Sequence, residues 1–534
     1  MNSGIPLNPE GTLNYTYDVA GNVASIYSSS VHGASMAYTY DSLNRLSTVV
    51  DNNLPADSNT TAYAYDTASN LVTVTDPNKL QSTIQYDSLN RLTSLNTATP
   101  NSSAVAGYSY TLGATGNRTG ATEQTGRTLT WNYDGIYRLT SEAVSNDQSG
   151  GNGEVDYTLD PVGNRTSTAS SLPGVPSVSL ASFNLDDWLS PETYDANGNT
   201  LTTGGKTFTY DSENHLVSMN GGAVTMIYDA FGNRVAKKVG NVTTTYLVED
   251  DVNPTGLPQV FEESVNGVLQ RTYTYGLQRI SENQIISNTW QPSFYMYDGF
   301  GSVRQLTNLS GTVTDTYNYD AFGNLLNSTG STPNNYLYRG EQYDPDLGLY
   351  YLRARYYNPQ TGRFLSRDPE DGNPFDEVTL HKYLYAGSNP VSYVDPSGKG
   401  FLDYITPSEN AIPMSKLVSI YGCVSSVGFT VTSIVLESSF TGYTMAGIAG
   451  TAFGCVTAFA PAQSSVKLVG LALKLVPTIN YGFCGASLAA VVNDFSGLSD
   501  SKSPNASAAA LVDSLGTLTG CVATRLGQIL EQEE

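Results

Sequence analysis

Charged side chains, histidine and tryptophan are scarce in this chain. Of its 534 residues 14% are charged, three are tryptophan and three are histidine, at His32, His215 and His381. No two histidines are close in sequence, and the chain has no H-E-x-x-H, G-x-S-x-G or G-x-x-x-x-G-K-[ST] motif. We therefore expect no cofactor and no metal ion, and read His381 as a packing residue.

Cysteine is absent from the first three quarters of the chain. The four cysteines, Cys423, Cys455, Cys484 and Cys521, all lie near the C-terminus. Their wide separations fit no C-x-x-C metal or redox motif. Two disulfides and four buried thiols are the alternatives that this spacing leaves.

Positive charge is also in short supply. The chain has 49 Asp and Glu against 26 Lys and Arg, which gives a formal net charge of -23. Such a chain repels phosphate backbones and anionic lipid surfaces at long range. We expect no nucleic-acid partner for its main body. A neutral or cationic partner fits better.

An ordinary secretory signal is missing as well. Residues 1–4 (MNSG) lead into a polar stretch without a basic segment or an apolar run. We expect the chain to be secreted or displayed on the cell surface by a specialised route, and otherwise to stay in the cytoplasm.

Tyrosine and glycine, by contrast, are abundant, with 37 and 50 residues, and they recur in a short unit. The unit is plainest in YTYDSLNRL, from Tyr38, and in IQYDSLNRL, from Ile84. Its aspartates recur at intervals of 21 to 25 residues, at Asp18, Asp41, Asp66 and Asp87. This regularity indicates a repeat array.

Each unit predicts one β-hairpin. Aromatic-x-Tyr has the period of two typical of strands, and Asp-x-x-Gly/Asn-Asn supplies turn residues. The return strand carries apolar residues that share a face with the tyrosines: Leu46, Leu92, Leu139 and Val235. One hairpin cannot bury that face, so neighbours must pair into a long, coiling sheet. We expect a mainly β fold, irregular where Thr111 or Gly276 replaces aspartate and between Asp160 and Asp195.

The array also bears on partners. Its tyrosines have two interpretations: core packing, or a carbohydrate-binding surface on which they stack with asparagine hydrogen bonds nearby. The first unit begins at Tyr15 without a polar cap, which leaves a strand edge open. We expect a short array, a fragment of a longer protein, or a chain that needs a partner to close it.

A different segment follows the repeats. Residues 336–369 read YLYRGEQYDPDLGLYYLRARYYNPQTGRFLSRDP, and residues 380–400 read LHKYLYAGSNPVSYVDPSGKG. With the Tyr-Asp units, over roughly residues 12–400, this closely resembles the RHS, or YD-repeat, family and its repeat-associated core, as in toxin-complex C proteins and RHS polymorphic toxins.

The resemblance implies an architecture and a function. Residues 1–335 are expected to form a spiralling YD-repeat β-shell, and residues 336–400 a core that plugs it. Residues 401–534 are then the cargo, an effector or toxin that the shell of a bacterial protein encapsulates and delivers. A delivery or shell-closing protein and an immunity protein are the implied partners.

The resemblance also implies aspartyl self-cleavage that releases the C-terminal region. Carried over by position, the catalytic residues are Arg355, Asp368 and Asp395, and the cut falls at Lys399-Gly400. Two carboxylates that share a proton can act as acid and base. The alternative is structural, with Asp-Pro turns and an arginine ion pair. This chain departs from the family at Glu370-Asp371-Gly372 and at Lys399, where leucine is usual.

The tail, residues 401–534, predicts a mostly helical apolar domain. Residues 417–436, 438–466 and 475–493 contain no charged residue, and each is long enough to span a bilayer as a helix. The second run has small residues at four-residue intervals: Ala446, Gly450, Gly454 and Ala458. Membrane insertion, a soluble helical hairpin and a passenger held inside the shell remain open.

The sequence therefore leads to encapsulation and delivery of the tail, with self-cleavage as the only enzymatic activity. Two alternatives remain. One is a cell-surface adhesion or carbohydrate-binding protein whose repeats carry the function, and the other is an inactive fragment of a larger RHS protein.

Overall fold

The structure, a computed structural model, describes residues 11–250, 252–372, 377–400 and 402–403. The chain divides into two compact units, Met1–Pro413 and Met414–Glu534. The expected tail helices, the small residues Ala446, Gly450, Gly454 and Ala458, and the cysteines lie outside the described residues. Within the described part the fold is mainly β, as predicted.

The first large sheet has fourteen strands, and each pairs antiparallel with the next along the chain. They are β1 (Leu13–Tyr17), β2 (Val23–Ser28), β3 (Ser35–Tyr40), β4 (Leu46–Asp51), β5 (Thr60–Tyr65), β6 (Leu71–Thr75), β7 (Gln81–Tyr86), β8 (Leu92–Ala98), β9 (Ala104–Leu112), β10 (Arg118–Glu123), β11 (Thr128–Tyr133), β12 (Leu139–Ser145), β13 (Gly153–Leu159) and β14 (Arg165–Ser170). Among the described strands, β1 pairs only with β2.

The second large sheet repeats this order after a short break. Its strands are β17 (Thr193–Tyr194), β18 (Thr200–Thr203), β19 (Lys206–Tyr210), β20 (Leu216–Met219), β21 (Val224–Tyr228), β22 (Arg234–Val239), β23 (Val242–Glu249), β24 (Gln259–Val265), β25 (Val268–Tyr275), β26 (Arg279–Ile286), β27 (Thr289–Tyr297), β28 (Val303–Thr307), β29 (Val313–Tyr319) and β30 (Leu325–Thr329). A separate hairpin, β15 (Ser182–Phe183) and β16 (Leu189–Ser190), fills the break.

The core segment forms small sheets of its own. β31 (Gln342–Asp344), β32 (Leu349–Leu352), β33 (Arg355–Asn358) and β34 (Arg363–Phe364) make one, and β35 (Tyr393–Val394) pairs with β36 (Leu402–Asp403). The short helices of the described part are α1 (Glu377–Leu380) and the 3-10 turns η1 (Asn220–Gly222), η2 (Tyr338–Gly340) and η3 (Tyr385–Ser388).

The Tyr-Asp turn has one recurring geometry, seen at Asp41. One oxygen of its carboxylate accepts the N–H groups of Leu43, at 2.8 Å, and Arg45, at 3.0 Å, while the other accepts Arg45 Nε at 2.7 Å. Asn44 takes the positive φ, 60°, that asparagine tolerates. The predicted hairpin per repeat is confirmed, with the aspartate as the acceptor that organises its turn.

The tyrosine before each aspartate ties successive hairpins together. The Tyr40 hydroxyl donates to the carbonyl of Val23 at 3.0 Å, and the Tyr65 hydroxyl donates to that of Leu46 at 2.8 Å. The acceptor in each pair is the first residue after the preceding turn. Several aromatic rings of these units are buried in the core, as the packing interpretation predicts: Tyr38, Tyr108, Tyr110, Trp131 and Tyr157.

The sheet is irregular where the sequence suggested, but less than expected. Between Asp160 and Asp195 it splits, and Asn184 takes the place of aspartate, with its Oδ1 accepting the N–H groups of Asp186 and Trp188 at 2.9 Å. Near Thr111 the sheet continues through β9 and β10, because Gly113 occupies the turn position instead.

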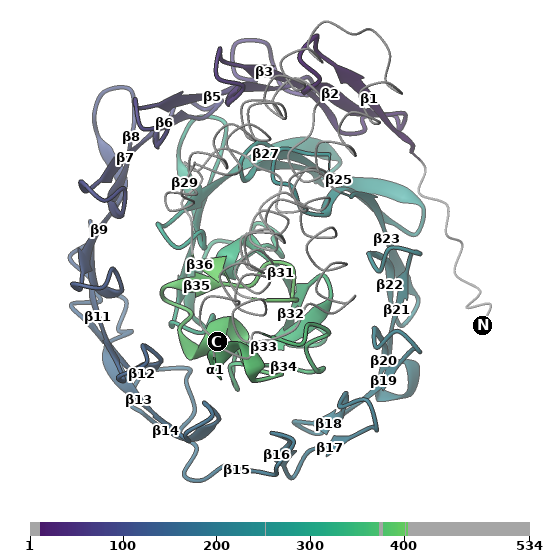
Figure 1. Ribbon diagram of the computed structural model, residues 1–534. Helices are drawn as coiled ribbons and strands as arrows, with labels where there is room; N and C mark the ends of the chain where they lie inside the picture. Colours follow the sequence, from purple (N-terminus) through teal and green to yellow (C-terminus); the bar gives the residue numbers. More distant parts are fainter. Residues whose placement is uncertain (1–10, 251, 373–376, 401, 404–534) are drawn as a thin grey trace, which may run out of the picture. The chain divides into compact units, whose positions relative to one another are not determined.

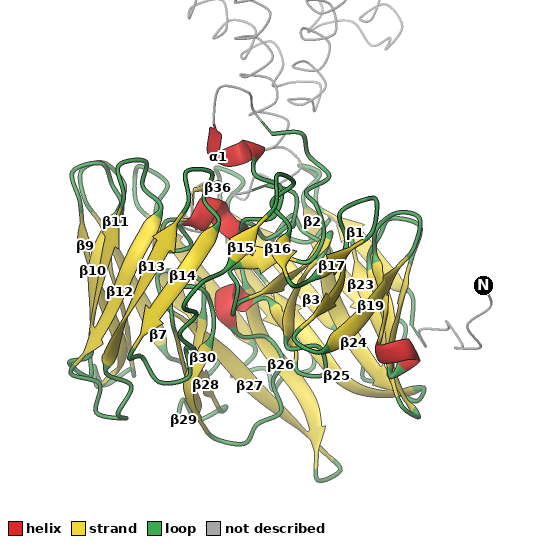
Figure 2. Ribbon diagram, turned by 90° about the horizontal axis from the view of Figure 1, so that it is seen from below, coloured by secondary structure: helices red, strands yellow, loops and turns green. Residues whose placement is uncertain are grey.

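The strands follow one another around a ring and then begin a second turn inside it (Figure 1). Ala34 donates its N–H to Glu262 at 2.9 Å, and Gly299 donates its N–H to the Tyr110 hydroxyl at 2.6 Å. Approach is so close there that a Cβ on Gly299 would lie 2.5 Å from Tyr110. Figure 2 shows the hairpins side by side, with their connections at two ends.

Candidate functional site

Arg355 is the centre of the candidate site. It begins β33, and its side chain, 2% exposed, reaches two carboxylates through Nη2: Asp368 at 2.7 Å and Asp395 at 3.1 Å. The guanidinium lies 3.6 Å from the centre of the Phe364 ring. The structure thus brings together all three residues that the sequence named.

Backbone contacts place these side chains. Arg355 Nε donates to the Gly398 carbonyl, and its Nη1 donates to the Lys382 carbonyl at 3.2 Å. The same Lys382 carbonyl accepts the N–H of Asp368 at 2.8 Å. One arginine therefore joins β33, the two Asp-Pro turns and the strand-like segment between them.

The loop that contains the expected cut wraps around Asp395. The Oδ1 atom of Asp395 accepts the N–H of Lys399 at 3.1 Å and that of Gly400 at 3.2 Å. Gly398 has φ of +68°, and a Cβ there would lie 2.4 Å from the Leu352 carbonyl, so this turn requires glycine. Asp395 consequently touches the nitrogen of the Lys399-Gly400 bond, and the Lys399 side chain is exposed.

Burial raises the pKa of both carboxyl groups. It raises the pKa of Asp395 to about 6, even though Arg355 opposes the shift. Burial also raises the pKa of Asp368 against the same guanidinium. Arg355 favours the ionised form of both carboxyl groups, and Lys382 adds to this at Asp368, but burial outweighs them in each case.

His381 is held as a neutral packing residue. Its Nε2 lies 2.9 Å from Asn164 Oδ1, and its Nδ1 accepts the N–H of Tyr383 at 3.1 Å. Burial, together with Arg363, lowers the pKa of His381 to about 3. The structure thus gives His381 the packing role read from the sequence.

The described residues contain neither a metal-type cluster nor a membrane helix. No group of three or more His, Cys, Asp or Glu is arranged there to hold a metal ion. No helix in the same residues is long and apolar enough to cross a bilayer.

Sequence reasoning missed a set of arginines that fasten the inner layers to the outer wall. Arg118 donates to the Gly299 carbonyl at 2.8 Å, and Arg234 donates to Asp344 at 3.1 Å in the core segment. Arg165 lies 4.0 Å from the centre of the Phe322 ring. Each follows Gly-Asn in its repeat, whereas plain wall repeats carry an apolar residue there, so G-N-R was the available signal.

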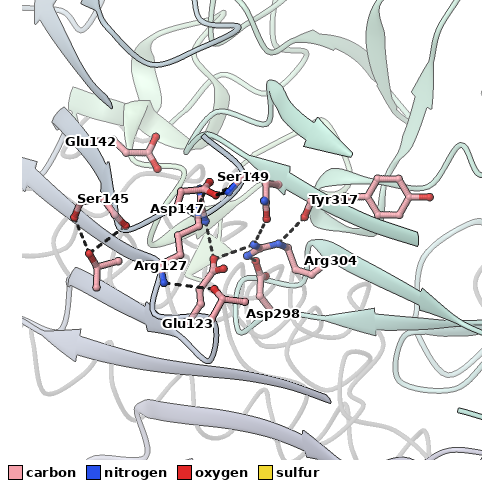
Figure 3. A network of polar contacts seen from close by, with 12 residues as sticks. Glu123, Arg127, Glu142, Ser145, Asp147, Ser149, Asp298, Arg304 and Tyr317 are labelled. Atoms are coloured by element: carbon pink, nitrogen blue, oxygen red, sulfur yellow. Dashed lines mark hydrogen bonds and ion pairs between the residues drawn. The ribbon is translucent and has the colours of Figure 1, made fainter. Parts of the chain in front are cut away.

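A buried ionic network joins the first and second turns of the sheet (Figure 3). Glu123 Oε1 lies 2.6 Å from Arg127 and 2.9 Å from Arg304. Arg127 also contacts Asp147 at 3.1 Å, and Arg304 contacts Asp298 at 3.2 Å. Removal of one partner would leave a buried charge unpaired, so we assign this network to shell closure.

Comparisons with known proteins give the context of this site. The family described as teneurin YD-shell matches residues 6–172 and 179–391. The tRNA3(Ser)-specific nuclease WapA of Bacillus spizizenii is 36% identical over 233 residues, 41% of this chain and 10% of the relative. The tRNA nuclease WapA of Bacillus subtilis strain 168 is 34% identical over 231 residues, with the same coverage. The chain spans about a tenth of the length of these relatives.

A solved structure shares the fold. The crystal structure of TcdB2-TccC3 is similar with a TM-score of 0.60 and 19% identity, and the similarity covers 73% of this chain and 22% of that chain. Because the family match extends over more than half of the residues and the Tyr-Asp hairpins account for it physically, the chain belongs to the teneurin YD-shell family of RHS, or YD-repeat, proteins.

Proposed function

We propose that this chain is an RHS-type shell that delivers its C-terminal region as an effector and frees it by cutting the Lys399-Gly400 bond. The observation that carries the proposal is the contact of Asp395 Oδ1 with the Gly400 nitrogen at 3.2 Å, beside Arg355 and Asp368. The residues of the site lie within the part of the chain that matches the family, or directly after it.

The chemistry is hydrolysis. Asp368, kept partly ionised by Arg355, takes a proton from water, whose oxygen bonds to the Lys399 carbonyl carbon. Protonated Asp395 gives its proton to the Gly400 nitrogen as the C–N bond breaks. This leaves an amine on Gly400 and a carboxylic acid on Lys399, which then loses its proton to water. A pKa of about 6 suits an acid that must be protonated in part of the population near neutral pH.

The relatives support delivery of a toxic cargo. WapA is named as a tRNA nuclease, and the similar solved structure is that of TcdB2-TccC3. By analogy, residues 401–534 are the effector, a delivery protein is the partner, and the site of action is outside the producing cell. An immunity protein and a target membrane belong to the same proposal, with Ala446, Gly450, Gly454 and Ala458 as the helix-packing residues in lipid.

The experiment compares variants of the full chain on a denaturing gel after purification at pH 6. Wild type should give two fragments, whereas Asp368→Asn and Asp395→Asn should each give one band. Arg355→Gln should slow the cut without abolishing folding, as circular dichroism would check. An uncut wild type that matches Asp368→Asn at every pH would assign the three residues a structural role.

A further inference from the structure

Three turns of the chain share the sequence Tyr-Asp-x-Phe-Gly. Their phenylalanines are Phe231, Phe300 and Phe322, each two residues after the aspartate. In the Asp229 and Asp320 turns even the intervening residue, alanine, is the same. The backbone is the same too, since Phe231 and Phe322 donate their N–H groups to that aspartate at 2.9 and 3.0 Å.

Two of these phenylalanines are inserted into the wall of the first turn of the sheet. Phe322, 2% exposed, packs edge-on against Tyr157 with ring centres 5.1 Å apart, and the Arg165 guanidinium lies 4.0 Å from its ring centre. Phe300 repeats the arrangement one hairpin earlier, with Tyr110 at 5.3 Å and Arg118 at 4.3 Å. The receiving cleft is thus an aromatic ring of one strand and the G-N-R arginine beside it.

The third phenylalanine has no such cleft. Phe231 is 81% exposed, although its turn matches that of Phe322 in sequence and hydrogen bonding. Other turns of the first sheet present apolar residues at this position as well, 51 to 70% exposed: Leu43, Leu89, Ile136 and Val162. An apolar rim therefore runs along the Tyr-Asp turns, and its largest side chain is Phe231.

We propose that Phe231 docks this chain to another protein by inserting into a sheet of Tyr-Asp hairpins in that protein. The wall would present an aromatic ring and an arginine, as Tyr157 and Arg165 do for Phe322. Arginine over a phenylalanine face gains cation-π attraction when both are removed from water. The formal net charge of -23 and the exposed Glu213 in the neighbouring turn favour such an arginine-bearing partner.

A second copy of this chain suits the role less well. Among the described residues, its clefts at Tyr110 and Arg118 and at Tyr157 and Arg165 are already filled, by Phe300 and Phe322. The occupant must therefore bring a wall whose cleft is vacant. Docking through Phe231 does not require self-cleavage, so the two proposals can fail separately.

The test places the photo-cross-linker p-benzoylphenylalanine at position 231 of the full chain, in the native host, and maps the product by mass spectrometry. The cross-link should join position 231 to a Tyr-Asp strand of a different protein, next to an arginine. The same cross-linker at position 322 is the internal standard, because it should react within the chain with residues 157–165. Position 242, on an exposed residue at the opposite end of the hairpins, is the negative control.

Binding of the captured protein then gives the quantitative check. With purified components, Phe231→Ser should weaken binding at least about tenfold, since burial of one phenylalanine is worth that much, and Val242→Ser should leave it unchanged. A cross-link from position 231 to a protein without Tyr-Asp repeats, to a second copy of the chain, or to residues 404–534 would overturn the proposal. The absence of any cross-link from position 231, while position 322 still reacts within the chain, would also overturn the proposal.

Discussion

Glu262 of β24 accepts the N–H of Ala34 at 2.9 Å, and the two residues are 228 positions apart in the chain. The other oxygen of Glu262 accepts the Ser30 hydroxyl at 2.9 Å, and the carboxylate is 3% exposed. A single side chain thus satisfies two donors of the first hairpins and holds the second turn of the sheet against them.

We therefore expect Glu262→Ala to lower the free energy of unfolding by about 1–3 kcal/mol, since one buried and one partly buried donor lose their acceptor. Chemical denaturation of the purified chain would measure the loss. The matched control is Glu213→Ala, because that side chain is 70% exposed and should change stability by less than about 0.5 kcal/mol. Equal losses of stability from both variants would contradict the role of Glu262 in holding the two turns of the sheet together.

The hydrogen bonds from tyrosine hydroxyls to the preceding hairpins lead to a second prediction. Tyr40→Phe removes only the hydroxyl that donates to Val23, so it should cost about 1 kcal/mol of stability. Tyr17 has the same place in the first described hairpin and is 57% exposed, so Tyr17→Phe should be neutral. If thermal melting shows no difference between the two variants, the hydrogen bond from Tyr40 to the preceding hairpin does not stabilise the sheet.

A third prediction concerns pH. Burial raises the pKa of Glu282 to about 8, against the attraction of Arg271, and the Tyr295 hydroxyl donates to it at 3.0 Å. A carboxyl whose pKa is higher in the folded state stabilises most at low pH, and the contribution is lost as pH rises through 8. The melting temperature should fall as the pH rises from about 5 to about 8, and the contribution of Glu282 should be constant above that.

Glu282→Gln separates this group from the others. It removes the titration, so the difference in melting temperature between wild type and variant should shift in favour of the variant as pH rises. Glu213→Gln serves as the control, because it makes the same chemical change at a side chain that is 70% exposed. A parallel profile for wild type and Glu282→Gln would show that Glu282 is ionised in the fold.

The hairpins and their sheet could be predicted because their signals are local. The Tyr-Asp dipeptide specifies both the turn at Asp41 and the hydroxyl of Tyr40 that binds the preceding hairpin. Arg355, Asp368 and Asp395 could be named only through the family resemblance. The nesting of the second turn could not be predicted from the turns themselves, since Phe231 and Phe322 both stand in the segment YDAFGN but have opposite burial. That difference depends on which wall each turn meets.

Lys399 supplies a fourth prediction. The family usually has leucine before the cut, and here an exposed cation stands at that position. Lys399→Leu should accelerate self-cleavage several-fold, as followed by the loss of intact chain on gels over time. Lys399→Gln distinguishes the causes: it accelerates the cut only if the charge itself is the obstacle. If neither variant cuts faster, residue 399 does not limit the reaction.

Self-cleavage at a defined bond is the central claim, and the mass and N-terminal sequence of the released fragment test it most directly. After incubation of the full chain at pH 6, we expect a fragment that begins with Gly400 and a complementary one that ends with Lys399. Above pH 6 the rate should fall as Asp395 loses its proton. A chain that keeps its intact mass from pH 4 to 9, or a new N-terminus at any other residue, would rule out self-cleavage at the Lys399-Gly400 bond.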